Sequence, residues 1–242
     1  MAGNPYTESG DKFQIPDMLA NRADIYNLGD IIGDSADAFK LSYLENSLTS
    51  NSILAKLAMK SQADVHTLIK VAQSGSQDGV QFEANHSADE VREYVSVLQK
   101  MLVIRDTVLS VNQEYIRSAA QADAYRTEPP FKLQGSYRDM NKMAEKVMPI
   151  MNEQELKTLI NTHYENEAQT LTSGAEANLL KFKELHKALN EADQQRWDAI
   201  KAVFQKQQRT KSYGQNGMGQ AVETMEDIST SLKGIMEWLH KK

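Results

Sequence analysis

Two arginines of this sequence occupy positions from which they could contact a phosphate group. Arg22 follows a short segment that begins at Pro16, and Arg138 falls in the first turn of an expected helix. A guanidinium is planar and permanently charged, so it can stabilise the charge that develops on phosphoryl oxygens during transfer. The alternative is that both are ordinary surface arginines, because charged residues usually lie on solvated faces.

The segment around Arg22 is expected to contain the only strands of the chain. It has the sequence MAGNPYTESGDKFQIPDMLANRADIYNLGDI. Three small or apolar residues, expected to end a buried strand, precede a turn at Asn4-Pro5, since both residue types favour turns. Pro16 suits the first turn of a short helix, where its missing N–H costs nothing. A second strand-like run covers residues 24–28.

The segment around Arg138 predicts a capped amphipathic helix. Its sequence is EPPFKLQGSYRDMNKMAEKVMPIM, in which two prolines end the preceding element. Gly135-Ser136 is expected to form the turn and the N-cap. Lys142 lies one turn after Arg138. The apolar stripe of this helix is expected to comprise Met140, Met143, Ala144 and Val147.

The order of these features resembles the second half of the core of AAA+ ATPases, most closely the MoxR branch. The resemblance implies that Asn4 is the sensor 1 residue, which helps to orient the attacking water. It implies that Arg22 is the arginine finger, which reaches the γ-phosphate bound by a neighbouring subunit. The Gly-x-x-Arg pattern is similar to the sensor 2 segment of AAA+ lids, which implies that Arg138, with Lys142 as a second candidate, binds the nucleotide phosphates of its own subunit.

Nearly the whole chain is similar to the C-terminal region of a bacterial family described as DNA repair ATPases. The segments SAAQADAYRTEPPFKLQGSYRDMNKMAEKV and HYENEAQTLTSGAEANLLK carry this resemblance together with the N-terminal one. The resemblance supports ATPase membership better than it supports a role in repair. The alternative for Asn4 is a simple turn former, and for Arg138 an exposed arginine on an ordinary capped helix.

Two parts that ATP hydrolysis needs are missing from the sequence. No segment has the form G-x-x-x-x-G-K-[ST] that holds the β- and γ-phosphates, and the glycine-rich stretches at 75–79 and 214–219 lack its Gly-Lys-Ser/Thr step. No apolar strand ends in paired acids that could hold magnesium. We therefore expect no hydrolysis by the isolated chain, and ATP and Mg²⁺ only together with a missing N-terminal half. The chain is expected to be a truncated or split gene product that assembles with such a half or with other AAA+ subunits.

The composition gives little support for other kinds of function. The net charge is −6, from 27 Lys and Arg against 33 Asp and Glu, so nucleic acid stays a partner that the charge does not favour. Residues 199–222 hold four basic side chains and no acid, which is a weak patch. Cysteine is absent, and the five histidines form no His-x-x-x-His pair, so we expect no metal site. Without an export signal or an apolar span, we expect no membrane association and a cytoplasmic location.

From residue 35 onward the hydrophobic periodicity is helical, so we expect a mainly α protein. The fold class expected is a remnant of an AAA+ α/β core followed by a multi-helix lid with a long inserted helix. The longest helix, Ala88–Ala124, would extend ~50 Å and is interpreted as an arm. The other helices are expected at 37–48, 51–59, 61–72, 153–168, 174–189, 191–208 and 220–240.

Four domains are expected from these patterns. Residues 1–34 form the trailing part of the core, and residues 35–127 form the helical insertion with its arm. Residues 128–209 form the sensor 2 lid and helical bundle, and residues 210–242 form a flexible linker, at 210–219, followed by a terminal amphipathic helix. A function of a different class stays open beside the ATPase: a non-catalytic helical module that binds another protein through the long helix or the terminal one.

Overall fold

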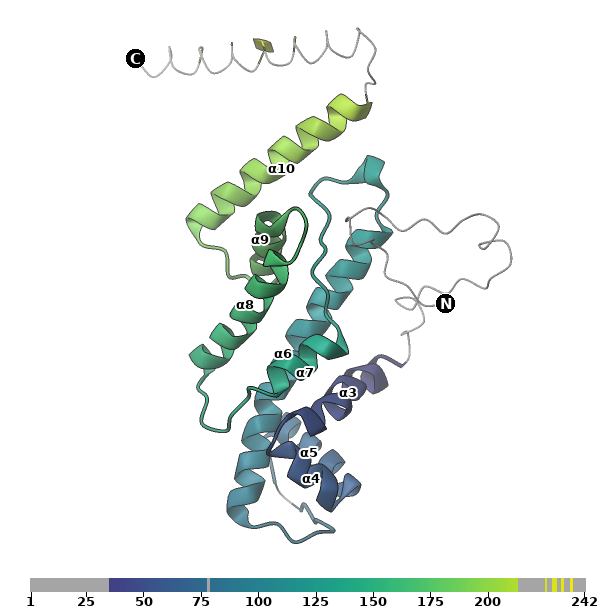
Figure 1. Ribbon diagram of the computed structural model, residues 1–242, viewed down its shortest axis with the longest axis vertical. Coiled ribbons are helices and arrows are strands. Elements are labelled where there is room, and N and C mark those ends of the chain that lie inside the picture. The colour runs from purple at the N-terminus through teal and green to yellow at the C-terminus, as the bar shows by residue number, and fades with distance from the viewer. Residues whose placement is uncertain are drawn as a thin grey trace, which may run out of the picture. The chain divides into compact units, whose positions relative to one another are not determined.

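The computed structural model describes residues 35–77 and 79–212 and, beyond these, Met225, Ile228, Ser229, Leu232 and Met236. Asn4, Arg22 and the expected core remnant at 1–34 lie outside the described residues. The described residues form eight α-helices and no strand (Figure 1). The expectation of a mainly helical protein is therefore confirmed for this part of the chain.

The elements follow one another along the chain, and the longer connections are those between α5 and α6 and between η3 and α7. They are α3 (Ala36–Ser47), the 3-10 turn η2 (Leu48–Ser50), α4 (Leu54–Lys60), α5 (Gln62–Ser74), α6 (Ala88–Ala120), the 3-10 turn η3 (Asp123–Tyr125), α7 (Tyr137–Ala144), α8 (Glu153–Gln169), α9 (Ala175–Leu185) and α10 (Glu191–Ser212). None of the described helices is both long and apolar enough to cross a membrane.

The described chain forms two compact units. Unit 1 comprises its residues up to Ala120 together with Phe131–Ala188, and therefore contains α3 to α9. Unit 2 comprises Gln121–Pro130 and the described residues from Leu189 onward, and contains η3 and α10. The domain boundaries expected from the sequence stay a prediction.

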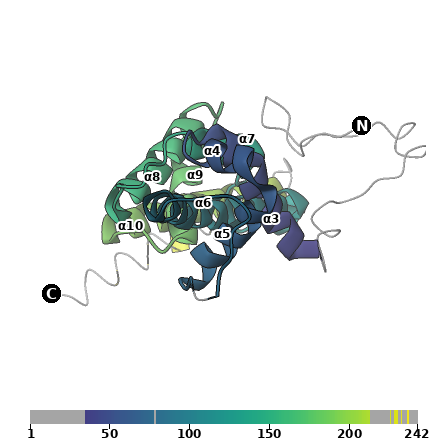
Figure 2. The ribbon, with the colours of Figure 1, turned by 90° about the horizontal axis from the view of Figure 1, so that it is seen from below.

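Helix α6 is the central helix of unit 1. The helices α3, α5, α7 and α9 all pack against it, and Figure 2, which looks nearly along α6, shows other helices of this unit around it. Its buried side chains run from Val91 to Ala119, because its apolar residues occupy more than one face. They include Tyr94, Val97, Leu98, Met101, Ile104, Val108 and Val111. The helix that was expected to project as an arm therefore forms part of the core.

Helix α6 ends at Ala120, four residues before the expected end. In a continued helix the Gln121 carbonyl would accept the amide of Tyr125. That carbonyl instead accepts Nη2 of Arg126, at 3.2 Å, and the Tyr125 amide donates to the Ala122 carbonyl, at 3.0 Å. These two bonds replace the helical one after Ala120, whereas helical periodicity alone predicted a longer α6.

The ends of other helices also differ from expectation. Helix α4 begins at Leu54 and not at residue 51, because the 3-10 turn η2 and Asn51 precede it. Helix α9 ends at Leu185 and not at residue 189, since Lys187 adopts the left-handed φ of 53° that terminates helices. Helix α10 continues to Ser212, so the expected linker at 210–219 begins with helical residues. The hydroxyl of Thr210 bonds back to the carbonyl of Lys206, at 3.1 Å, within that helix. Residues 213–219 lie outside the described part.

Candidate functional site

Arg138 and Lys142 lie one turn apart on α7. The expected cap is confirmed: Ser136 Oγ accepts the Asp139 amide, and the Asp139 carboxylate accepts the Ser136 amide at 2.9 Å. The expected apolar stripe is buried, with all four of its side chains no more than 2% exposed. Since that stripe faces the core, Arg138 and Lys142 lie on the solvent side of the helix.

Gly135 brings the start of α7 against α6. A Cβ atom at this residue would lie 1.9 Å from the carbonyl oxygen of Val108 and 2.7 Å from the amide nitrogen of Asn112. Only glycine, which has no Cβ atom, therefore fits this close to the backbone of α6. The carbonyl of Gly135 also accepts the hydroxyl of Tyr43, from α3, at 3.0 Å. The N-terminus of α7 is thus fixed against two other helices.

A pair of tyrosines holds the same end of α7. The rings of Tyr43 and Tyr137 stack with their centroids 4.2 Å apart, and the hydroxyls of Tyr137 and Ser42 are 2.7 Å apart. Burial, together with the nearby Tyr137 and Asp139, raises the pKa of Tyr43 to about 12. Its phenol therefore stays protonated and continues to donate to the Gly135 carbonyl.

Asn51 holds the other end of α7. Its Nδ2 donates to the carbonyls of Ala144, at 2.8 Å, and Val147, at 2.9 Å. Its Oδ1 accepts the amides of Ile53 and Leu54 just before and at the start of α4. The asparagine is 1% exposed, so it satisfies buried backbone groups that water cannot reach.

One carboxylate, that of Glu167 on α8, faces both cations of α7. Lys142 Nζ lies 2.8 Å from Glu167 Oε1, and Arg138 Nη2 lies 3.6 Å from Glu167 Oε2. The side chains of Arg138 and Lys142 are 68% and 47% exposed, whereas that of Glu167 is 23% exposed. The structure therefore brings the two predicted phosphate ligands together and places an acidic group between them.

A surface pocket of about 510 Å³ opens beside these cations. It is lined by Ser50, Arg138, Asn141, Lys142 and Glu145. The buried Oδ1 atom of Asn141 finds no hydrogen-bond partner among the described residues. The pocket lining thus combines two exposed cations with the carboxylate of Glu145 and with uncharged polar groups, and the two cations are the groups that can bind an oxyanion by charge.

A buried contact between a histidine and a carboxylate ties α7 to α8 next to Glu167. Nε2 of His163 lies 3.3 Å from Oδ1 of Asp139, and their side chains are 9% and 1% exposed. Burial by itself would raise the pKa of Asp139, but the hydrogen bonds from His163 and Ser136 outweigh it and hold that pKa below its ordinary value. Asp139 therefore stays ionised and keeps both the cap and the helix contact.

Asp139, His163 and Glu167 could each offer one ligand atom to a metal ion, and these atoms lie within 4.8 Å of one another. The carboxylate oxygens already accept hydrogen bonds from Ser136, His163 and Lys142. The positive charges of Lys142 and Arg138 at the same place oppose a divalent cation. The arrangement is chemically better suited to an ion-pair network than to a metal.

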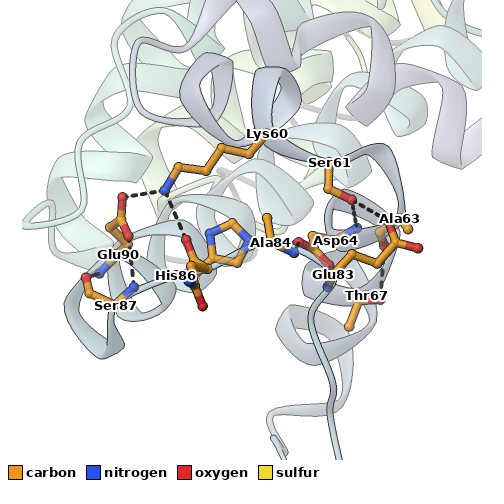
Figure 3. Close-up of polar contacts among 11 residues, drawn as sticks. Lys60, Ser61, Ala63, Asp64, Thr67, Glu83, Ala84, His86, Ser87 and Glu90 are labelled. Atoms are coloured by element: carbon orange, nitrogen blue, oxygen red, sulfur yellow. Dashed lines mark hydrogen bonds and ion pairs between the residues drawn. The ribbon is translucent and has the colours of Figure 1, made fainter.

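A second buried polar cluster joins α5 to the segment before α6 (Figure 3). The carboxylate of Asp64 accepts the amides of Glu83, at 2.8 Å, and Ala84, at 2.9 Å, and lies 2.8 Å from Nε2 of His86. The side chains of Asp64 and His86 are each at most 1% exposed. Burial would raise the pKa of Asp64, but these hydrogen bonds outweigh it and lower that pKa. The cluster fixes the segment and presents no reactive group to solvent.

His163 and Glu167 were not among the residues predicted for the site. Their spacing is a signal, because a histidine and a carboxylate four residues apart share one face of a helix. The expectation of no metal site rested on the absence of paired histidines. The contact of Glu167 with α7 crosses 25 residues to Lys142, and no local pattern predicts it.

The comparisons with known proteins give no relative. A scan against models of protein families, a search of curated proteins and a search of solved structures each found no match to this chain. Its function is therefore inferred from its own residues.

Proposed function

We propose that this chain is the C-terminal, sensor-and-lid part of an AAA+ ATPase. In this proposal it contributes to ATP hydrolysis within an assembled oligomer, and the phosphate loop and magnesium-binding acids come from residues outside this sequence. The observation that carries the proposal is the pairing of Arg138 with Lys142 at one pocket, on a helix whose two ends are fixed.

The physical basis is electrostatic positioning. Phosphoryl transfer is accelerated mainly by fixed positive charges around the transferred group, and such groups act best when their support does not move. The contacts of Gly135, Tyr43 and Asn51 fix the backbone of α7, while the exposed ends of Arg138 and Lys142 can still turn toward a ligand. In this proposal both bind the nucleotide phosphates of the same subunit.

The N-terminal residues complete the proposed site. Asn4 would orient the attacking water, and Arg22 would act in trans on the γ-phosphate held by a neighbouring subunit. ATP and Mg²⁺ would bind only when the phosphate loop is present. The partners proposed are therefore other AAA+ subunits or a chain that carries the first half of the ATPase domain.

The test is an ATPase assay on the chain reconstituted with a polypeptide that carries the phosphate loop and the paired acids. Arg138→Ala should reduce turnover by about 10²-fold, as the loss of one fixed charge-stabilising group does in other enzymes. Lys142→Ala should cause a smaller loss. Lys157→Ala removes an exposed lysine of α8 and serves as the matched control. If the Arg138 variant turns over ATP as fast as the control, Arg138 does not bind the nucleotide phosphates as proposed.

A non-catalytic module that binds another protein is the second candidate, and an exposed apolar turn between α7 and α8 favours it. Ile150 is 88% exposed and Met148 51%. The turn is rigid, since the Pro149 carbonyl accepts Ser96 Oγ and Lys100 Nζ, both at 2.9 Å. Apolar groups held in this way suit a protein surface. A reconstituted mixture without ATPase activity, in which Ile150→Ser abolishes a stable complex, would favour this candidate.

A further inference from the structure

We infer that Glu167 is a built-in competitor for phosphate, so that its ion pairs with Arg138 and Lys142 and the binding of phosphate at their pocket exclude one another. The inference rests on the proposed function, because it takes a phosphate group as the ligand of this pocket. It adds a means of regulation: the cations are held by an internal carboxylate until a phosphate replaces it.

The two ion pairs differ in a way that permits exchange. Lys142 makes a close contact with Glu167, at 2.8 Å, whereas the contact of Arg138 is looser, at 3.6 Å. Arg138 is also the more exposed of the two, at 68%. Exposed ion pairs of this kind are weak, since water and salt screen them. A stronger anion can therefore take the cations from Glu167 without disrupting the core.

Glu167 itself is held in place on α8. His163, one turn earlier on the same helix, is tied to the buried Asp139 of α7. That tie fixes the face of α8 that carries Glu167 against α7. Exchange therefore requires the ends of Arg138 and Lys142 to turn from Glu167 into the pocket, and not a separation of the two helices.

An anion that binds here must compete with two carboxylates for the two cations. Glu167 pairs with Arg138 and Lys142, and Glu145 lines the pocket, so two negative charges offset the two positive ones. An incoming anion therefore binds through direct contacts with the cations after these leave Glu167, and not through a net positive charge of the pocket. A phosphate group carries nearly two charges and three acceptor oxygens, and a guanidinium can bind two of these at once. An anion such as chloride has only one charge and no oxygen atoms that a guanidinium could bind in pairs.

The experiment is an isothermal calorimetric titration of the full chain with pyrophosphate at low ionic strength. Glu167→Gln removes the competing charge and keeps the size of the side chain. It should strengthen pyrophosphate binding about threefold to tenfold, which corresponds to the loss of two exposed ion pairs. ADP carries the same two phosphates, and the same gain is expected for it. Adding Arg138→Ala to Glu167→Gln should abolish the gain.

Glu165→Gln is the matched control. Glu165 lies on the same helix, is exposed, and loses the same charge on substitution. A general electrostatic effect would strengthen binding equally in both variants and would overturn the inference. It is also overturned if Glu167→Gln binds no more tightly than the wild type, or if no variant binds pyrophosphate. Binding with the expected gain, in a chain that never supports ATP hydrolysis, would instead refute only the proposed function.

Discussion

Replacing Gly135 by alanine places one methyl group where α7 begins and α6 passes closest to it. The new Cβ would lie 1.9 Å from the carbonyl oxygen of Val108, 2.7 Å from the amide nitrogen of Asn112 and 2.9 Å from the carbonyl carbon of Val108. Carbon is normally about 3.5 Å or more from a non-bonded heavy atom, so the closest contact is too short by roughly 1.5 Å.

The backbone must absorb this overlap, because all three atoms belong to the main chain of α6. Val108 is fully buried, so α6 cannot shift without disturbing the core. The φ of Gly135 is not among the positive values, so the cost comes from the close approach alone. We expect a loss of about 3 kcal/mol in the free energy of unfolding, the upper part of the range for overpacked cores. For a chain of this size that lowers Tm by about 6–12 °C.

The assay is thermal and guanidinium unfolding followed by circular dichroism. Gln134→Ala changes the exposed neighbouring residue and is the control, with an expected change within about 0.5 kcal/mol. A variant Gly135→Ala as stable as this control would show that α6 and α7 do not approach as described. The positions of Arg138 and Lys142 would then lose their support.

Two other predictions concern the buried carboxylates. Asp64→Ala leaves the amides of Glu83 and Ala84 and the ring of His86 without their partner. In guanidinium titrations it should lower the free energy of unfolding by about 3 kcal/mol. A change as small as that caused by Asp89→Ala, at an exposed residue, would contradict the role of this cluster. The pKa values of Asp64 and Asp139 lie below the ordinary 3.8 in the folded protein, so their contribution to stability is complete above that value and is lost as the pH falls through the lower folded values. Unfolding followed from pH 6 to pH 2 should show this loss below about pH 4, and a flat profile would count against the lowered values.

The local structure of the site could be predicted from sequence because its determinants are near in the chain. Serine favours the N-cap of a helix, so Ser136, just before the apolar stripe, predicted the cap of α7. The spacing of Met140, Met143 and Ala144 gave its buried face, which in turn put Arg138 and Lys142 on the exposed side. Each of these features depends only on the 3.6-residue period of a helix and on its unsatisfied terminal amides.

The long-range contacts could not be predicted in the same way. The sequence marks Gly135 as a turn residue, whereas its importance lies in the approach to Val108, 27 residues earlier in the chain. The pairing of Glu167 with α7 depends on how two helices cross. The central place of α6 depends on which helices cover its faces, and length alone suggested a projecting arm. Periodicity defines a face of a helix but does not name its partner.

The most direct test of the central claim is steady-state ATP hydrolysis by three samples. These are the chain alone, a polypeptide with the phosphate loop and paired acids alone, and the two together at equal concentration. We expect turnover only in the mixture, because neither part holds all the groups that phosphoryl transfer needs. A mixture no faster than the sum of its parts would contradict the claim, as would turnover by the chain alone.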